Sequence, residues 1–199
     1  EIFSNDKKLV SNSGYYPDTK NKLNKLSKST ALQNTLSIED YSSSDFIKSS
    51  NNFLIQKDLK IENKNIVFEK NYWKISASHN GYLKKFKLDH HREIEFYPEQ
   101  FKFIGHDKIV RKDPDKQIKF DIRFHLHPDS KVMKTQNNKF ILIQLEDEGW
   151  QFSCDNYDIN IDNGLYFGNK NSYQENQNIF ISGMNNESEQ IIRWEIIKI

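Results

Sequence analysis

Apolar and polar residues alternate along the chain from residue 66 to its end, and this period of two constrains the fold more than any other feature. In the run Phe120 to Leu126, every second residue is apolar and the residues between them are charged or polar. This pattern predicts a β-strand with one buried face and one solvated face. Strands of the same kind are predicted at residues 73–77, 150–154, 158–162 and 192–196.

The run Phe140 to Leu145 is apolar on both faces apart from Gln144, which predicts a central strand covered on both sides. Short turn signals separate the runs, at Asn137-Asn138, Glu148-Gly149, Asp155-Asn156 and Asn163-Gly164. Many short strands at close spacing are typical of a sandwich or a barrel. We therefore predict an all-β fold with little helix: one domain over residues 1–199, built as a large antiparallel β-sandwich of stacked sheets.

The first 60 residues lack the clear period of two. Asp18 to Ser29 is a polar run with interspersed lysines, predicted as a loop or a frayed segment. Leu32 to Ile38 is a candidate strand, and the serine-rich stretch Tyr41 to Asp45 is a predicted turn.

Composition excludes several classes of protein. The 29 basic and 28 acidic residues give a net charge of +1, so bulk charge does not indicate a nucleic-acid binder, and attraction to an acidic ligand requires a local cluster. No apolar stretch is long enough to insert across a membrane.

Cys154 alternates with Trp150 and Phe152, which favours a core residue over a nucleophile. Because the chain begins at Glu1 without a signal-peptide pattern, we expect a piece of a longer protein.

The first candidate site is the stretch Ser78 to Tyr82. His79 falls where a predicted strand runs into an Asn-Gly turn, and residues displayed at strand ends often bind ligands or act in catalysis. The alternative interpretation is a β-turn with His79 and Tyr82 packed beside it.

The second candidate site is His90-His91-Arg92. An arginine beside histidines can bind a carboxylate or a sulfate. Adjacent residues on a strand point to opposite faces, so His90 and His91 cannot both serve one site unless the strand bulges. The alternative is a solvated strand edge.

The third candidate is Arg123, His125 and His127, which share the predicted wet face of one strand. Two histidines at this spacing can bind zinc, but no third ligand is evident and Arg123 adds a positive charge. We favour a basic strip or a solvated surface, and we expect no metal and no cofactor.

These residues carry a resemblance to a known family. In their order and approximate spacing, the stretches resemble the C-terminal part of the heparinase II/III-like polysaccharide lyases, over most of the chain from about residue 10. The matching stretches are Ser29 to Leu36, His79 to Tyr82, His90 to Arg92, Ile122 to Pro128 and Glu148 to Trp150.

The resemblance implies an N-terminal α/α toroid, absent from this chain, and a C-terminal β-sandwich, with an acidic polysaccharide such as a glycosaminoglycan bound between them. It implies β-elimination at a uronic acid, which needs a neutralised carboxylate, a base and an acid. His79 and Tyr82 are the implied catalytic residues, and Gln33, Asn34, His91 and Arg92 the implied substrate-binding residues. The isolated domain is expected to be inactive. The implied location is the periplasm or the outside of the cell, and neither nucleic acid nor membrane is an expected partner.

The chain departs from the family pattern in the missing toroid and at Gln33, and with no self-contained catalytic set it leaves a second function open. Gln33 stands where the family usually has histidine, and Thr35 where some relatives have a metal-binding histidine. Glutamine can hydrogen-bond a carboxylate but cannot act as a general acid or base near neutral pH. The alternative is a non-catalytic carbohydrate-binding or structural β-sandwich that has lost lyase activity.

Overall fold

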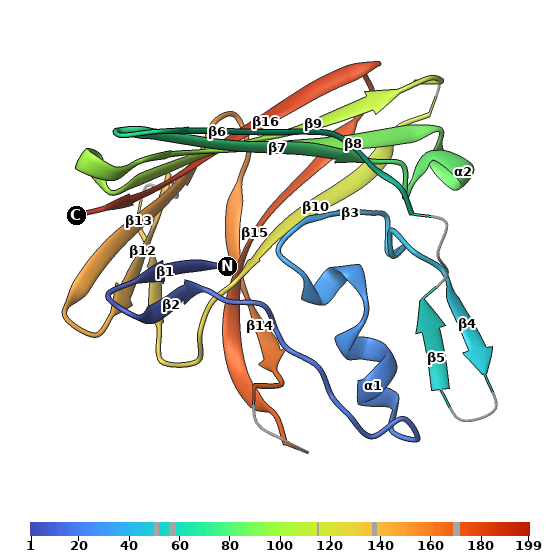
Figure 1. Ribbon diagram of the computed structural model, residues 1–199, viewed down its shortest axis with the longest axis horizontal. Coiled ribbons are helices and arrows are strands. Elements are labelled where there is room, and N and C mark those ends of the chain that lie inside the picture. The colour runs from blue at the N-terminus through green and yellow to red at the C-terminus, as the bar shows by residue number, and fades with distance from the viewer. Residues whose placement is uncertain (50–51, 56–58, 115, 137–138, 169–171) are drawn as a thin grey trace.

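Two antiparallel sheets dominate the computed structural model, which describes residues 1–49, 52–55, 59–114, 116–136, 139–168 and 172–199 (Figure 1). The larger sheet has eight strands, in the order β11 (Lys131–Lys134), β12 (Phe140–Leu145), β13 (Glu148–Cys154), β16 (Glu189–Lys198), β9 (Lys102–Arg111), β8 (Leu88–Tyr97), β7 (Tyr72–His79) and β6 (Ile61–Glu69). The smaller sheet has four, in the order β14 (Ile159–Tyr166), β15 (Gln174–Asn185), β10 (Ile118–His125) and β3 (Leu36–Ile38). The predicted all-β antiparallel sandwich is therefore confirmed.

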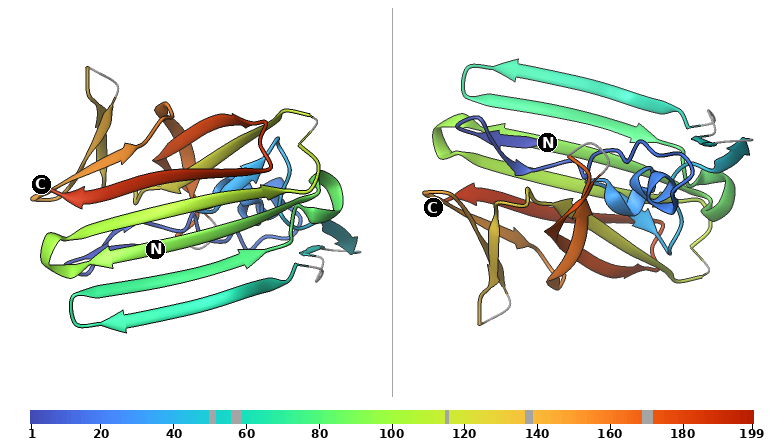
Figure 2. Two further views of the ribbon diagram at one scale, coloured as in Figure 1. Left: turned by 90° about the horizontal axis from the view of Figure 1, so that it is seen from above. Right: turned by 90° about the horizontal axis from the view of Figure 1, so that it is seen from below.

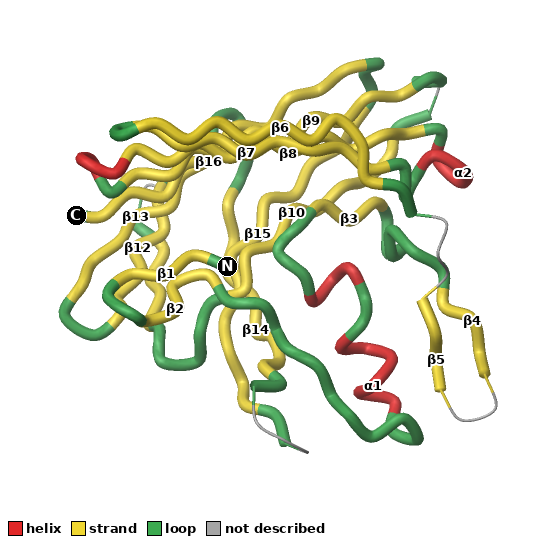
Figure 3. Tube along the Cα trace, in the orientation of Figure 1, coloured by secondary structure: helices red, strands yellow, loops and turns green. Residues whose placement is uncertain are grey.

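Smaller elements decorate the two sheets. Strands dominate the described chain, and helix is confined to short pieces (Figure 3). The hairpins and helices are β1 (Ile2–Ser4) with β2 (Lys7–Val10), β4 (Phe46–Ser49) with β5 (Asn52–Ile55), α1 (Lys22–Ser27), α2 (Leu83–Phe86), and the 3₁₀ helices η1 (Thr30–Leu32) and η2 (Pro98–Gln100). Within the described residues, no helix has the length and hydropathy needed to cross a bilayer.

Aromatic rings form the centre of the core between the two sheets. Phe124 of β10 meets Phe152 of β13 and Trp194 of β16, with ring centroids 4.9 and 4.7 Å apart. Trp194 and Phe152 are almost completely buried. The alternation that predicted these strands thus places their apolar residues at the contact between the sheets.

Several predictions from local pattern are wrong, for identifiable reasons. Asp121 and His125, predicted on a wet face of β10, are buried. The segment that contains η1 folds over His125, whose Nε2 lies 3.0 Å from the Ala31 carbonyl oxygen, and the Asp121 carboxylate accepts from the Ser182 hydroxyl of the neighbouring β15. The polar run from residue 18 to 29 contains α1, whose first turn is capped by Asn21 accepting from the Leu23 N–H. Strand β12 lies between two strands, but only one of its faces is fully buried.

The predicted turns have mixed outcomes. Asn156 adopts a φ of 63°, which fits the predicted turn at 155–156. Asn163 and Gly164 instead lie within β14, and Glu148-Gly149 begins β13 after a turn in which Glu146 has a φ of 53°. Of Leu32 to Ile38, only Leu36–Ile38 forms a strand, since η1 ends at Leu32. The predicted turn at 137–138 lies outside the described residues.

Candidate functional site

Strand pairing brings four chemistry-bearing residues together on the inner face of the larger sheet. His79, the last residue of β7, pairs with His90 of β8, and Arg92 of β8 pairs with Asp107 of β9. The pairing between β7 and β8 runs without a bulge, so His91 points to the opposite face from His90, as predicted. His90 is buried and His91 is half-buried on the outer face.

The two histidines and Asp107 form a continuous hydrogen-bonded chain. The Asp107 Oδ1 lies 2.6 Å from the His90 Nε2, and the His90 Nδ1 lies 3.1 Å from the His79 Nε2. The chain ends where the Gly81 N–H donates to the His79 Nδ1 at 3.2 Å. A carboxylate only accepts and a main-chain N–H only donates, so both neutral rings carry their proton on Nε2. All four ring nitrogens therefore have a partner.

Asp107 is the anchor of this network. It is fully buried, and its carboxylate accepts from the Arg92 Nε at 2.8 Å, the Arg92 Nη2 at 3.0 Å and the Trp194 Nε1 at 2.8 Å. Burial by itself raises the pKa of Asp107, but the Arg92 charge and the hydrogen bonds from His90 and Arg92 outweigh it and hold the pKa well below its usual value. The carboxylate is thus charged across the whole physiological range.

His79 is held neutral at ordinary pH. Burial, together with the neighbouring His90 and Arg92, lowers the pKa of His79 to about 4. A neutral imidazole is the form that can accept a proton, but the only lone pair on His79 is occupied by the Gly81 N–H. His79 can act as a base only if that hydrogen bond opens.

Arg92 connects the network to the segment that precedes β3. Its Nη1 donates to the Asn34 carbonyl oxygen, in addition to the two bonds to Asp107. The Asn34 side chain in turn bonds to the Ser11 carbonyl oxygen at 3.0 Å and to the His125 N–H at 2.6 Å. With a side chain 19 % exposed, Arg92 is mainly a structural bridge, and it also lines a groove on the inner face of the larger sheet.

Gln33 lies beside Asn34 but in a separate interaction. The Asn12 Nδ2 donates to the Gln33 Oε1 at 2.9 Å, and the Gln33 Nε2 donates to the Ser27 carbonyl oxygen at 3.3 Å. Asn12 is a partner that the sequence analysis did not identify, because the two residues are far apart along the chain. The amide of Gln33 acts here as a link between the segments that flank α1.

Tyr82 lies behind His79 in the core. Only 1 % of it is exposed, its hydroxyl donates to the Leu36 carbonyl oxygen at 2.9 Å, and its ring centroid is 5.8 Å from that of His79. Burial raises the pKa of the Tyr82 hydroxyl above its usual value. This packing matches the structural alternative considered for the turn, and the catalytic assignment of Tyr82 stays a prediction.

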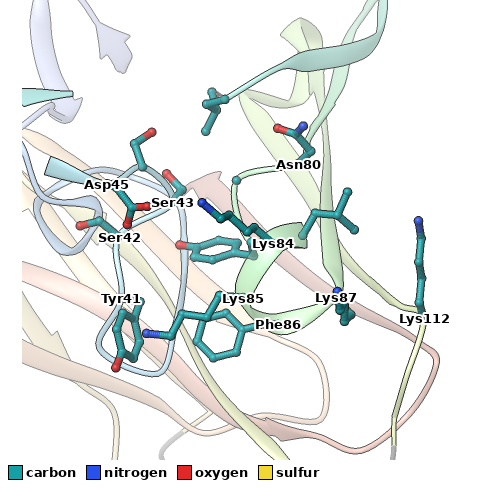
Figure 4. A pocket seen from close by; sticks show the side chains of 15 residues that line it. Tyr41, Ser42, Ser43, Asp45, Asn80, Lys84, Lys85, Phe86, Lys87 and Lys112 are labelled. Carbon is teal, nitrogen blue, oxygen red and sulfur yellow. The ribbon is translucent and has the colours of Figure 1, made fainter. Parts of the chain in front are cut away.

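A hollow that we name the lysine pocket opens on the far side of the same turn (Figure 4). Its volume is about 730 Å³, and its walls come from residues 41–45, from Asn80 to Lys87 and from Lys112. Four lysines are among the residues that line it: Lys84, Lys85, Lys87 and Lys112. The Lys-Lys pair in α2 is the signal in the sequence that could have indicated this pocket. The contribution of Lys112, which is distant from α2 in the sequence, could be seen only in the structure.

A second hollow, which we name the apolar groove, lies on the inner face of the larger sheet beyond the edge of the smaller one. Its volume is about 500 Å³, with Arg92 and Asn34 at its rim. Phe68, Trp73, Phe96 and Phe103 form a ladder of facing residues across β6, β7, β8 and β9. Phe68 is 74 % exposed and Ile66 73 %, and the view from below shows the β6–β7 hairpin uncovered (Figure 2).

The third predicted cluster does not converge on a metal site. His125 is buried, Arg123 donates to the Asn178 Oδ1 at 2.8 Å, and the His127 Nδ1 lies 3.3 Å from the Asp129 carboxylate. Within the described residues, possible metal ligands gather instead at Glu93, Glu95 and His106 on the outer face of the larger sheet. There the Lys74 ammonium already pairs with Glu93, 3.2 Å away.

Comparison with known proteins agrees with this architecture. The sequence profile described as "Heparinase II/III-like, C-terminal" matches residues 1–195. The crystal structure of heparan sulfate lyase HepC from Pedobacter heparinus superposes with a TM-score of 0.77 at 13 % identity, covering 97 % of this chain and 29 % of that one. A structure of heparinase III superposes with a TM-score of 0.68 at 14 % identity, covering 98 % of this chain and 28 % of that one.

A curated protein also matches part of the sequence. FtsZ-localized protein C of Caulobacter vibrioides (strain NA1000 / CB15N) is 26 % identical over 129 residues, which are 60 % of this chain and 22 % of that protein. The chain thus spans less than a third of the length of each of these relatives. Because the profile match extends over nearly the whole sequence, the chain belongs to the heparinase II/III-like C-terminal family.

Proposed function

We propose that residues 1–199 are the single sandwich domain of a polysaccharide lyase that cleaves an acidic, uronate-containing glycan by β-elimination. The observation that supports this most is the convergence of motif residues that are far apart in sequence. His79, Arg92 and Asn34 belong to one connected polar network, and Arg92 and Asn34 also line the apolar groove. Substrate access places such an enzyme in the periplasm or outside the cell.

In this proposal the residues divide the chemistry of the elimination between them. Arg92 and Asn34, which line the groove, contact the sugar carboxylate, and Gln33, next to Asn34 in the chain, contributes a further polar contact. His91 faces the other side of the sheet, so in this proposal it does not contact the sugar in the groove. His79 receives or returns a proton once the Gly81 N–H releases its Nδ1. Tyr82 reaches the substrate only if its bond to the Leu36 carbonyl oxygen opens. Each catalytic group thus requires the turn after β7 to move.

We further propose that an α/α toroid of the same protein covers the apolar groove. Exposed apolar surfaces of this kind mark interfaces in soluble proteins. The Ile66, Phe68 and Ile75 side chains are each more than half exposed in this chain, and the solved relatives are more than three times longer. The glycan would then lie between the toroid and the Arg92–Asn34 rim.

A non-catalytic sandwich is the second candidate function, and three observations favour it. The amide of Gln33, where the family has histidine, is bound to Asn12 and to the Ser27 carbonyl oxygen. His79 has no unoccupied ring nitrogen. The name of the curated relative, FtsZ-localized protein C, describes a location rather than a carbohydrate reaction.

The deciding experiment uses the full-length gene product and a panel of uronate polymers. We expect an unsaturated uronate product, followed by its ultraviolet absorbance, and a loss of about 100-fold or more in rate for His79→Ala, as for removal of a general base. His127→Gln, a half-buried histidine outside the network, is the matched control and should keep its rate. Glycan binding without product would support the non-catalytic alternative, and a failure to bind any of the polymers would contradict both.

A further inference from the structure

The lysine pocket is built by three separate parts of the chain that are fixed to one another. The Lys112 N–H donates to the Lys87 carbonyl oxygen at 3.0 Å, which attaches the end of β9 to the end of α2. A Cβ at residue 81 would clash with the Ser43 carbonyl oxygen, so Gly81 allows the turn after β7 to pack closely against residues 42–44. Ser43 is held in turn by its N–H donating to the Thr30 Oγ1 at 2.9 Å.

Positive charge around this pocket is not neutralised by the protein. Among the described residues, none of Lys84, Lys85, Lys87 and Lys112 forms an ion pair, and Asp45 is the one carboxylate in the lining. All four lysines are exposed, and they extend from the side of the hollow opposite Tyr41, Ser42 and Asp45 (Figure 4). In a chain of net charge +1, such a local excess produces a positive potential concentrated in one hollow.

The other lining groups fit a sugar rather than a bare ion. The Tyr41 ring is half exposed and meets the Phe86 ring edge-on with centroids 5.6 Å apart. The Lys85 ammonium lies 2.7 Å from the Tyr41 ring centroid, so ring and ammonium are presented together at the entrance. The Asn80 Oδ1 accepts from the Lys60 N–H at 2.9 Å, which leaves its NH₂ group to donate to a ligand. A hollow of about 730 Å³ lies in the range that takes a small-molecule-sized ligand.

We propose that the lysine pocket binds the sulfate esters of a sugar unit in a sulfated glycan. Ammonium groups are compact point charges that can surround a sulfate, whereas planar recognition of a carboxylate favours arginine, which is absent from this lining. This inference rests on the proposed function for its glycan, and it adds a subsite and a preference for sulfation.

The test measures the affinity of the chain of residues 1–199 for three oligosaccharides of equal length: a heparin fragment, its desulfated form and an unsulfated polyuronate. We expect the heparin fragment to bind tightest, and the double variant K84A/K112A to bind it about tenfold more weakly, as for the loss of two exposed charge contacts. Both lysines are exposed, so circular dichroism and the melting temperature should not change. The matched control K20A/K131A removes two exposed lysines elsewhere and should bind like the wild type.

Each other result contradicts the pocket assignment. An equal loss in both double variants would mean that overall charge, rather than the pocket, attracts the glycan. Equal affinity of the wild type for sulfated and desulfated chains would contradict the preference for sulfate. Binding of inorganic sulfate but of none of the oligosaccharides would contradict the assignment of a sugar ligand. The proposed function is tested separately: if the full-length protein shows lyase activity, that function holds whichever of these outcomes is found for the pocket.

Discussion

The buried His125 and the partly buried His79 make the stability of this protein depend on pH. Burial lowers the pKa of His125, as it does that of His79, to about 4, from an ordinary value near 6.5. Between these two values the unfolded chain binds more protons than the folded one, so the folded state loses stability as the pH falls. His90, whose pKa burial also lowers, acts in the same direction.

We therefore expect the free energy of unfolding to fall as the pH goes from 7 to 4.5, by about 2–3 kcal/mol for each of His79 and His125. Urea titrations at several pH values would measure this. His125→Gln keeps a donor for the Ala31 carbonyl oxygen but cannot titrate, so its pH dependence should be shallower by the contribution of one group. An unchanged slope in this variant would show that His125 is not buried as a neutral ring.

The sequence identified some of these residues but not their connections. His79, Arg92 and Asn34 were found because each lies in a recognisable stretch. Asp107 was missed, since it faces Arg92 through the pairing of β8 with β9, and a strand register cannot be derived from one strand alone. The burial of Tyr82 was also hidden, because a tyrosine after a turn has the same local pattern whether it points outward or inward.

Strand β9 packs closely against the Trp194 ring of its neighbour β16, and this contact depends on one residue of β9. Gly105 pairs with both Ile94 of β8 and Trp194 of β16, and a Cβ at Gly105 would overlap the Trp194 indole ring. That ring also donates to Asp107, so its displacement would disturb the anchor of the polar network. The close approach of an aromatic ring is a common reason for glycine inside a strand.

We expect Gly105→Ala to reduce the free energy of unfolding by about 3 kcal/mol, as for overpacking in a dense core. Gly149→Ala is the matched control, because the nearest atom that a Cβ there would meet is in the exposed Ile199 side chain, at 3.1 Å. Chemical denaturation of the two variants should separate them clearly. Equal stability would mean that the Trp194 ring can shift without loss.

At the scale of secondary-structure elements, the period of two predicted most of the strands, because each strand places alternate residues at the contact between the sheets. It did not predict what covers the second face of β10, because Asp121, Arg123 and His125 form a polar pattern that is typical of a wet surface. It also missed α1, whose six residues are too few to show a helical period.

At the scale of the whole molecule, the described residues leave an apolar face of the larger sheet uncovered, which predicts how the isolated chain behaves. Without a partner over the apolar groove, we expect the wild type to self-associate with rising concentration and to bind a hydrophobic dye. Ile66→Lys with Phe68→Lys should keep the chain monomeric with an unchanged fold, since both side chains are largely exposed. Sedimentation would measure this, with Met184→Lys, at an exposed position on β15, as the control. Association that persists in the groove variant would place the contact elsewhere.

The overall architecture was predictable from the sequence, but the two hollows were not. An all-β sandwich follows from alternation and turn spacing, and the family resemblance follows from the order of short stretches. The groove and the lysine pocket form where segments distant in sequence come into contact, as Lys112 does with α2. Local sequence patterns do not predict such contacts.

The turn after β7 contacts both the buried polar network and the lysine pocket, so binding at one can affect the other. Gly81 bonds to the His79 ring through its N–H, and it also lines the lysine pocket. If an occupant of the pocket shifts this turn, it changes the proton affinity of His79, and protonation of His79 must change the affinity of the pocket by the same factor. An anion at the surface and a proton in the interior would then act as effectors of each other, so the acidity of the surroundings would help decide how firmly the glycan is held.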